Sequence, residues 1–93
     1  IDDLGVSALA SVLQSNFSVT HLDLCLNQFG TIGVSDLATM LQVNTVLKSL
    51  DVSGNQIGDV GARHLALALQ SNSSLTKLDL RSTRIGDTET ELL

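Results

Sequence analysis

The chain has 93 residues, which is enough for one small domain or part of a larger one and excludes a multidomain enzyme. Hydrophobic residues make up 43% of it and aromatic residues only 2%, so any core must be built from leucine, valine, isoleucine and alanine. Five basic and ten acidic residues give a formal net charge of −5, which argues against nucleic acid or an anionic membrane surface as a partner.

The predicted elements alternate between helix and strand along the whole chain. In chain order they are a helix from about Asp3 to Asn16, a strand at 19–24, a helix from Thr31 to about Asn44, a strand at 47–52, a helix from Asp59 to about Asn72, a strand at 75–80 and the start of a fourth helix near Asp87. The residues that begin these helices are placed as N-caps. The asparagines that end them suit the left-handed conformation found just past many helices.

The elements repeat with a period of 28 residues. Aligning Leu22, Leu50 and Leu78 also aligns columns of glycine, leucine and asparagine on either side. Each predicted strand alternates apolar and polar residues, so one face is buried. The side chains expected inside are Leu22, Leu24, Leu50, Val52, Leu78 and Leu80.

A strand, a helix and a second parallel strand form a right-handed crossover, and repeating this unit stacks strands on one side and helices on the other. The sequence therefore predicts an α/β solenoid with a parallel sheet, which curves because helices are wider than strands. Residues 1–93 are expected to form one continuous domain of about three repeats. Because the chain starts at Ile1 and contains no proline, we expect it to be part of a longer array.

The pattern L-x-x-L-x-L-x-x-N occurs as Val19-x-x-Leu22-x-Leu24-x-x-Asn27, again from Leu47 to Asn55, and with Thr83 in the last position of the third copy. It resembles the leucine-rich repeat, and the 28-residue unit resembles the ribonuclease-inhibitor-like subclass. That subclass also occurs in NOD-like receptors, Ran GTPase-activating proteins and ciliary or cytoskeletal scaffolds. The resemblance implies a horseshoe with the sheet on its concave side, in which Asn27 and Asn55 hydrogen-bond buried loop backbone.

Side chains at alternate strand positions point away from the buried leucines and form a grid on the concave face. The candidate partner-binding residues are the members of this grid and one arginine in the loop that follows: His21, Asp23, Cys25, Ser49, Asp51, Ser53, Lys77, Asp79, Arg81 and Arg84. The aspartate column within the grid has two interpretations. It is either an acidic stripe that recognises a basic partner or a residue habitual in repeats of this subclass.

His21, Asp23 and Cys25 are residue types of a nucleophilic triad or a metal site. Residues two apart on a straight strand are about 6.5 to 7 Å apart, however, and no glycine-rich oxyanion site accompanies them. A structural zinc site needs four ligands, and Cys25 has no partner cysteine. We expect no catalytic residues, no metal and no cofactor.

The most consistent function is non-catalytic binding of a protein partner, as the resemblance implies. The alternatives are regulation of an enzyme such as a small GTPase, with Arg84 as an arginine finger, and a purely structural role within a larger scaffold. A single cysteine and a longest apolar run of five residues predict a cytoplasmic protein without a membrane span. Exposed terminal repeats predict end-to-end self-association.

Overall fold

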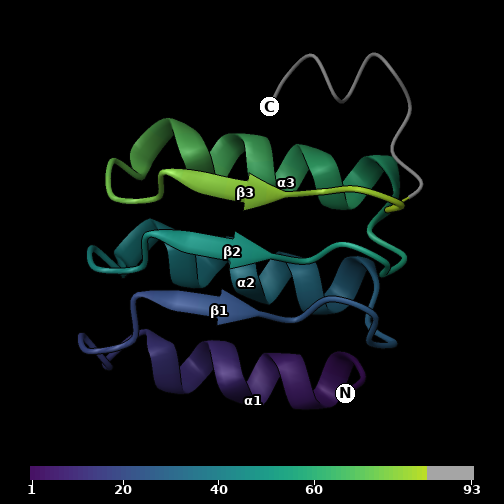
Figure 1. Cartoon of the computed structure of the whole chain (residues 1–93), viewed down its shortest axis with the longest axis horizontal. Coiled ribbons are helices and arrows are strands. Elements are labelled where there is room, and N and C mark those ends of the chain that lie inside the picture. The colour runs from purple at the N-terminus through teal and green to yellow at the C-terminus, as the bar shows by residue number, and fades with distance from the viewer. Residues whose placement is uncertain (84–93) are drawn as a thin grey trace.

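The computed structural model describes residues 1–83, so Arg84 and the fourth helix expected near Asp87 lie outside the described residues. Three helices and three strands alternate along this part of the chain: α1 (Asp3–Leu13), β1 (His21–Asp23), α2 (Thr31–Val43), β2 (Ser49–Asp51), α3 (Gly58–Ser71) and β3 (Lys77–Asp79). The strands lie side by side in one layer and the helices in a second layer behind it (Figure 1). The predicted α/β solenoid is confirmed.

The sheet is parallel in the order β1-β2-β3, and its register follows the sequence period. His21 pairs with Ser49 and Ser49 with Lys77, so each step across the sheet is one 28-residue repeat. Each connection passes through the helix layer and returns to the next strand, which is the usual right-handed crossover (Figure 1). A slip of one residue would have exchanged the buried and exposed faces of the strands.

The strands are three residues long, half the predicted length. At their start, the carbonyl of Thr20 accepts hydrogen bonds from the amides of both Lys48 and Ser49, so the regular ladder is interrupted. At their end, the chain turns, although single backbone bonds between repeats continue through the loops, for example from Leu26 N to Ser53 O and from Gly58 N to Thr83 O, both at 2.9 Å. The predicted ranges therefore included residues that bond between repeats without regular strand geometry.

Burial follows the predicted alternation, with differences at the first and last strands. Leu24, Leu50 and Val52 are buried as expected. Leu22, Leu78 and Leu80 are only half-buried. Among the described residues, β1 and β3 each have a strand neighbour on one side only, which leaves these leucines partly uncovered.

The polar side of the sheet departs from the prediction in the opposite direction. His21, Asp23 and Lys77 are exposed, as predicted, but Ser49, Asp51 and Asp79 are half-buried. Ser49 and Asp51 lie in the central strand, where neighbouring strands cover them on both sides.

The expected helix caps are wrong in a consistent way. Asp2, rather than Asp3, caps α1, and neither α2 nor α3 has a side-chain cap at its N-cap residue. The Asp3 carboxylate instead reaches the next repeat, where Oδ1 accepts hydrogen bonds from the amides of Gly30 at 2.9 Å and Gly33 at 2.8 Å. A Cβ at Gly33 would lie 2.9 Å from that oxygen, so only glycine leaves room for the contact. Asp3 thus caps the helix of the following repeat.

Replacing Asp3 with alanine is expected to lower the free energy of unfolding by about 1 to 2 kcal/mol, the range measured for lost N-caps. The amides of Gly30 and Gly33 at the start of α2 would lose their acceptor. Asp3→Asn keeps a carbonyl oxygen as acceptor, so its loss in free energy of unfolding should be smaller. Urea unfolding of the three proteins measures the difference; an alanine variant within about 0.5 kcal/mol of the unchanged chain would contradict the contact.

α2 and α3 end where predicted, at Asn44 and Asn72, but for a different reason, whereas α1 ends at Leu13, before Asn16. Asn44 follows α2 with φ −78° and ψ 129°, an extended rather than left-handed conformation. Its Nδ2 donates to the carbonyls of Leu13 at 2.9 Å and Asn16 at 3.2 Å, while its Oδ1 accepts from the amides of Val46 and Leu47. The side chain therefore ties its own loop to the preceding repeat.

Asn72 repeats this arrangement one unit later. Its Nδ2 donates to the carbonyls of Leu41 and Asn44, and its Oδ1 accepts from the amides of Ser74 and Leu75. The asparagines that end α2 and α3 thus form a ladder of side-chain amides that joins one repeat to the next.

The loops after the strands contain the second asparagine column. Asn55 is 2% exposed, and its Nδ2 donates to the carbonyls of Leu24, Val52 and Ser53. The Nδ2 of Asn27 donates to the carbonyls of Leu24 and Cys25. In the third loop, the Thr83 hydroxyl donates only to the Leu80 carbonyl among the described residues.

Candidate functional site

The surface of the sheet that faces away from the helices is called the strand face below. It contains an open hollow of about 350 Å³ whose lining comes from all three strands: His21, Leu22, Asp23, Ser49, Leu50, Asp51, Lys77, Asp79 and Arg81. Most of the polar residues expected to bind a partner therefore lie together around one hollow. Cys25 and Ser53 do not line it.

The aspartate column on the strand face stabilises the turns that follow the strands. Oδ1 of Asp23 accepts a hydrogen bond from the amide of Cys25, two residues on, at 3.0 Å. Asp51 accepts one from the amide of Ser53 at 2.9 Å and a second from its hydroxyl at 2.6 Å. Side chains of aspartate commonly bond backbone two residues ahead, so this column has a structural reason in each repeat.

Asp79 makes the same turn and adds an ion pair. Its Oδ1 accepts from the Arg81 amide at 3.1 Å, and its two carboxylate oxygens accept from Nε and Nη2 of the Arg81 side chain, the shortest contact being 2.7 Å. Arg81 is thereby held beside Asp79 and offsets its charge.

Two carboxyl groups of the aspartate column have pKa values lowered by hydrogen bonds. The backbone amide and side chain of Cys25 hold the pKa of the Asp23 carboxyl below its ordinary value of 3.8. Hydrogen bonds from the Arg81 side chain and amide lower the pKa of Asp79 in the same way. Both carboxylates are therefore charged at neutral pH.

The turns should weaken in acid. Because the pKa values of Asp23 and Asp79 are lowered by folding, their contribution to stability is complete above the ordinary carboxyl pKa of 3.8 and disappears as the pH falls below it. We expect the melting temperature to fall between about pH 5 and about pH 3, and Asp79→Asn to reduce that dependence. Thermal melts by circular dichroism at a series of pH values measure this; an unchanged pH profile in the variant would contradict it.

The structure records no hydrogen bond that joins His21 to Asp23 or Cys25. The Nδ1 atom of His21 lies 2.9 Å from the Thr20 hydroxyl, its hydrogen-bond partner among the described residues. The hydrogen bond between Cys25 and Asp23, followed by burial and the nearby carboxylates, raises the pKa of the thiol. A raised pKa disfavours the thiolate that nucleophilic chemistry needs.

One group of possible metal ligands occurs on the strand face within residues 1–83. Ligand atoms of Asp23, Cys25 and Asp51 all lie within 4.8 Å of one another. Both aspartates already accept backbone hydrogen bonds, and His21 is not part of the group. Three ligands, one of them a thiol with a raised pKa, do not complete a four-ligand structural zinc site.

Two polar groups of the strand face are not used by the fold. Within the described part of the chain, the Lys77 ammonium and the Ser49 hydroxyl make no hydrogen bond or ion pair. Lys77 is exposed, and Ser49 lies beside it on the central strand. These groups are available to a partner, whereas the aspartates and Arg81 are already engaged.

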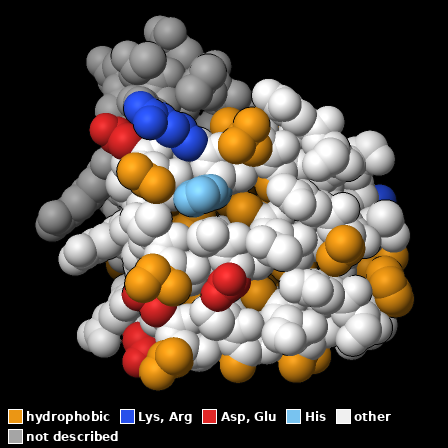
Figure 2. All heavy atoms as spheres, turned by 180° about the vertical axis from the view of Figure 1, so that it is seen from behind, with side chains coloured by type: hydrophobic (Ala, Val, Ile, Leu, Met, Phe, Trp, Pro, Cys, Tyr) orange, Lys and Arg blue, Asp and Glu red, His pale blue; other side chains and the backbone are white. Residues whose placement is uncertain are grey.

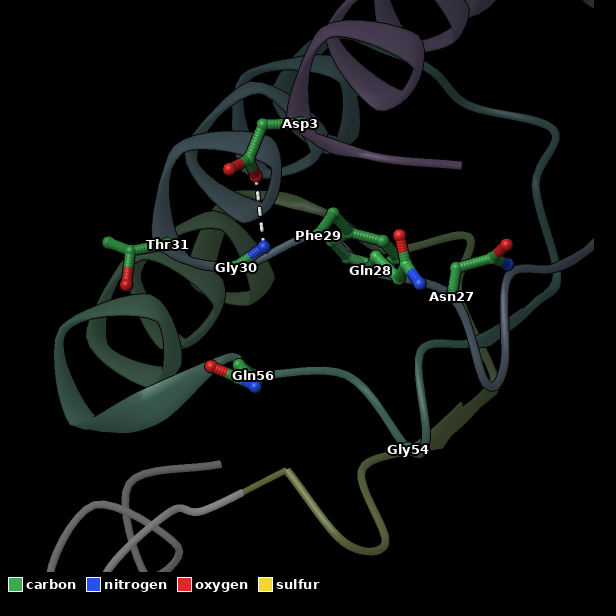
Figure 3. Close-up of a pocket in the computed structure, with 8 residues that line it drawn as sticks. All are labelled: Asp3, Asn27, Gln28, Phe29, Gly30, Thr31, Gly54 and Gln56. Carbon is green, nitrogen blue, oxygen red and sulfur yellow. Dashed lines mark hydrogen bonds between the residues drawn. The ribbon is translucent and has the colours of Figure 1, made fainter.

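A second hollow, of about 450 Å³, lies among the loops at the carboxyl ends of the strands. Its lining comes from the first two repeats: Asp3, Asn27, Gln28, Phe29, Gly30, Thr31, Gly54 and Gln56 (Figure 3). Figure 3 shows the Asp3 carboxylate directed at the Gly30 amide, so the start of α2 is already occupied by an anion of the chain itself. Gln28 and Gln56 are exposed and extend the polar surface beyond the strands.

Comparison with known proteins agrees with this architecture. A family model described as "Leucine Rich repeat" matches residues 15–38, 43–66 and 71–88. No curated protein sequence matches the chain.

None of the helices in residues 1–83 is long and apolar enough to cross a membrane.

Solved structures also share the fold. A structure titled "Leiomodin-1 Actin-Binding Site 2 (ABS2)" is similar over 99% of this chain, with a TM-score of 0.90 and 23% sequence identity. The chain spans 55% of that structure's length. At this identity the likeness shows a common fold.

Proposed function

The chain belongs to the leucine-rich repeat family, and from this premise we propose that it is a non-catalytic module that binds a protein partner through the strand face and the adjoining loops. The observation that carries the proposal is the single hollow that all three strands line with polar side chains in exact register. An open and polar surface suits another protein better than a small molecule, which needs an enclosed and largely apolar pocket.

The charge on the strand face indicates what the partner should carry. Asp23 and Asp51 give the β1 and β2 side of the hollow negative charge, while Arg81 offsets Asp79 and leaves Lys77 as the unpaired cation at β3. A matching surface would place basic groups over β1 and β2 and an acidic group over Lys77. Such complementarity fixes orientation and speeds association.

The first partner to test is actin, because the structural neighbour's title names an actin-binding site of leiomodin-1. Co-sedimentation with filamentous actin and a fluorescence titration with monomeric actin cover both of its forms. Binding should weaken at least about tenfold in Lys77→Glu, since it places a carboxylate where an acidic partner group is expected. Lys48→Glu is the matched control: it changes the net charge equally but does not line the hollow.

Equal losses in the two variants would show that overall charge rather than the strand face controls binding. Absence of binding to both forms of actin would remove actin as the partner. The strand-face proposal would then be tested with other protein partners by the same pair of variants.

We also propose that the chain belongs to the ribonuclease-inhibitor-like subclass, acts in the cytoplasm and forms part of a longer array. The support is the 28-residue period together with a full helix of 11, 13 or 14 residues in each described unit. Regulation of a small GTPase rests on Arg84, outside the described residues; hydrolysis assays with a panel of GTPases test it. If the role is purely structural, Lys77→Glu should have no effect on the binding of a protein partner.

Isolated residues 1–93 are expected to associate end to end. β1 and β3 each pair on one side only among the described strands, and Leu22, Leu78 and Leu80 beside them are half-buried. Sedimentation equilibrium should show a mass that rises with concentration. A monomer at every concentration would contradict this expectation.

A further inference from the structure

Three apolar side chains are exposed at the same position of successive repeats. Leu4, Ile32 and Val60 are 82%, 68% and 53% exposed and are separated by 28 residues. They lie in the first turns of α1, α2 and α3, on the side of the molecule opposite the strand face. Figure 2 views this helix layer and shows hydrophobic side chains on its surface with acidic side chains among them. These three residues are called the helix-end row below.

Packing within the fold does not explain the helix-end row. The helices pack on the core through other residues, such as Val34 and Leu37 of α2, which are fully buried. Single exposed hydrophobic residues are common on protein surfaces, but the same position is apolar and exposed in each of the three described helices. Apolar side chains that repeat in this way are typical of an interaction surface.

The surroundings of the helix-end row are acidic. Asp3, whose carboxylate caps α2, precedes Leu4, and Asp59 precedes Val60. Asp36, which accepts a hydrogen bond from the Ser7 hydroxyl, lies one helical turn after Ile32. These hydrogen bonds leave the charge of the carboxylates in place. Arg63, one turn after Val60, is the one lysine or arginine on the described helices. With a net charge of −5 for the whole chain, the row should attract a cationic partner. At this row, the equally acidic helix surface of a second copy and an anionic membrane are both disfavoured by the same charges.

The spacing of the row selects the form of that partner. Neighbouring packed helices lie about 8 to 10 Å apart. An α-helix advances about 10.5 Å in seven residues, so a helix lying across the row can place one side chain over each member. In an extended strand, side chains on one face repeat at about 6.8 Å and fall out of step with the row.

We propose that the helix-end row binds a basic amphipathic helix of a protein partner, with apolar residues seven apart, lying across the first turns of α1, α2 and α3. The apolar side chains of the partner contact Leu4, Ile32 and Val60, and its cationic side chains lie near the flanking aspartates. This surface is separate from the strand face, so the two can be occupied by different partners or by two parts of one partner.

The probe is a synthetic helical peptide of about 22 residues with leucine at every seventh position and lysines beside them. Its control is an isomer of the same composition with leucines five apart. Titration into ¹⁵N-labelled residues 1–93 should shift amide signals in the first turns of all three helices. The isomeric peptide should bind at least about tenfold more weakly, because its leucines cannot reach successive members of the row.

The protein variants are Ile32→Ser and, as the matched control, Leu26→Ser. Leu26 is also 82% exposed but lies in a loop outside the row, and the third repeat already has a serine, Ser82, at the equivalent position with the same positive φ. Ile32→Ser should lower the affinity for the peptide at least about tenfold, and Leu26→Ser should leave the affinity unchanged.

Equal affinity for the two peptides, or equal effects of the two variants, would overturn the proposal. So would self-association that Ile32→Ser abolishes, which would make a second copy the occupant. Binding to vesicles of anionic phospholipid that Ile32→Ser removes would likewise assign the row to a membrane.

Discussion

Replacing Leu50 with alanine is expected to lower the free energy of unfolding by about 3 to 5 kcal/mol, the upper part of the range for buried leucines. Leu50 is fully buried at the centre of the middle strand, with a repeat on either side. Little around it can collapse into the space that the side chain leaves. Urea unfolding followed by circular dichroism measures the loss, and a variant that is unfolded without urea also meets the expectation.

Leu22→Ala is the matched control, because Leu22 occupies the same position in β1 but is only half-buried. Its loss should be clearly smaller than that of Leu50→Ala. Equal losses would mean that the middle repeat does not carry a larger share of the core than the first repeat.

Replacing Asn44 with alanine is expected to lower the free energy of unfolding by about 3 kcal/mol. The side chain is 2% exposed and makes four hydrogen bonds to backbone groups of two repeats. Removing it leaves buried donors and acceptors without partners, each of which costs about 1 to 3 kcal/mol when water cannot reach it.

Thr45→Ala, at the exposed neighbouring position, is the control and should change stability by less than about 0.5 kcal/mol. The loss in free energy of unfolding for Asn55→Ala should lie between those for Asn44→Ala and Thr45→Ala. The Oδ1 atom of Asn55 has no partner among the described residues, so only the Nδ2 hydrogen bonds are lost. A loss for Asn44→Ala as small as that for Thr45→Ala would show that the ladder at the helix ends is not structural.

The repeat period was sufficient to predict the layers and the register of the fold. Leu22 pairs with Leu50, and Leu50 pairs with Leu78, as in the alignment of the repeats. A solenoid places equivalent residues of successive repeats side by side, so the sequence period predicts the register of the sheet. Leu24, Leu50 and Val52 are buried for the same reason.

Contacts between repeats could not be predicted from local patterns. An aspartate near a helix start and an asparagine near a helix end each have a common local role, and those roles were expected for Asp3 and Asn44. In the structure, Asp3 bonds Gly30 and Gly33, and Asn44 bonds Leu13, partners 27 to 31 residues away. The 28-residue period is the signal that could have indicated this, because a residue that recurs in each repeat of a solenoid can bond to the adjacent repeat as readily as within its own.

The candidate site was predictable as a set of residues but not as a set of roles. Strand alternation predicts which side chains face outward, yet it does not show that Asp23 and Asp51 bond the backbone of the following turns. The signal was an aspartate at a strand end followed by a turn, a common arrangement for such bonds. The helix-end row was missed because the expected binding surface lay on the strands.

The central claim is that the strand face binds the protein partner, and cross-saturation NMR tests it most directly. Unlabelled actin is irradiated in a complex with ¹⁵N-labelled residues 1–93, and the loss of signal is read at each amide. We predict losses at residues 21–25, 49–53 and 77–81, which include the lining of the hollow. Losses confined to the outer surfaces of α1, α2 and α3, with the strands unaffected, would contradict the claim.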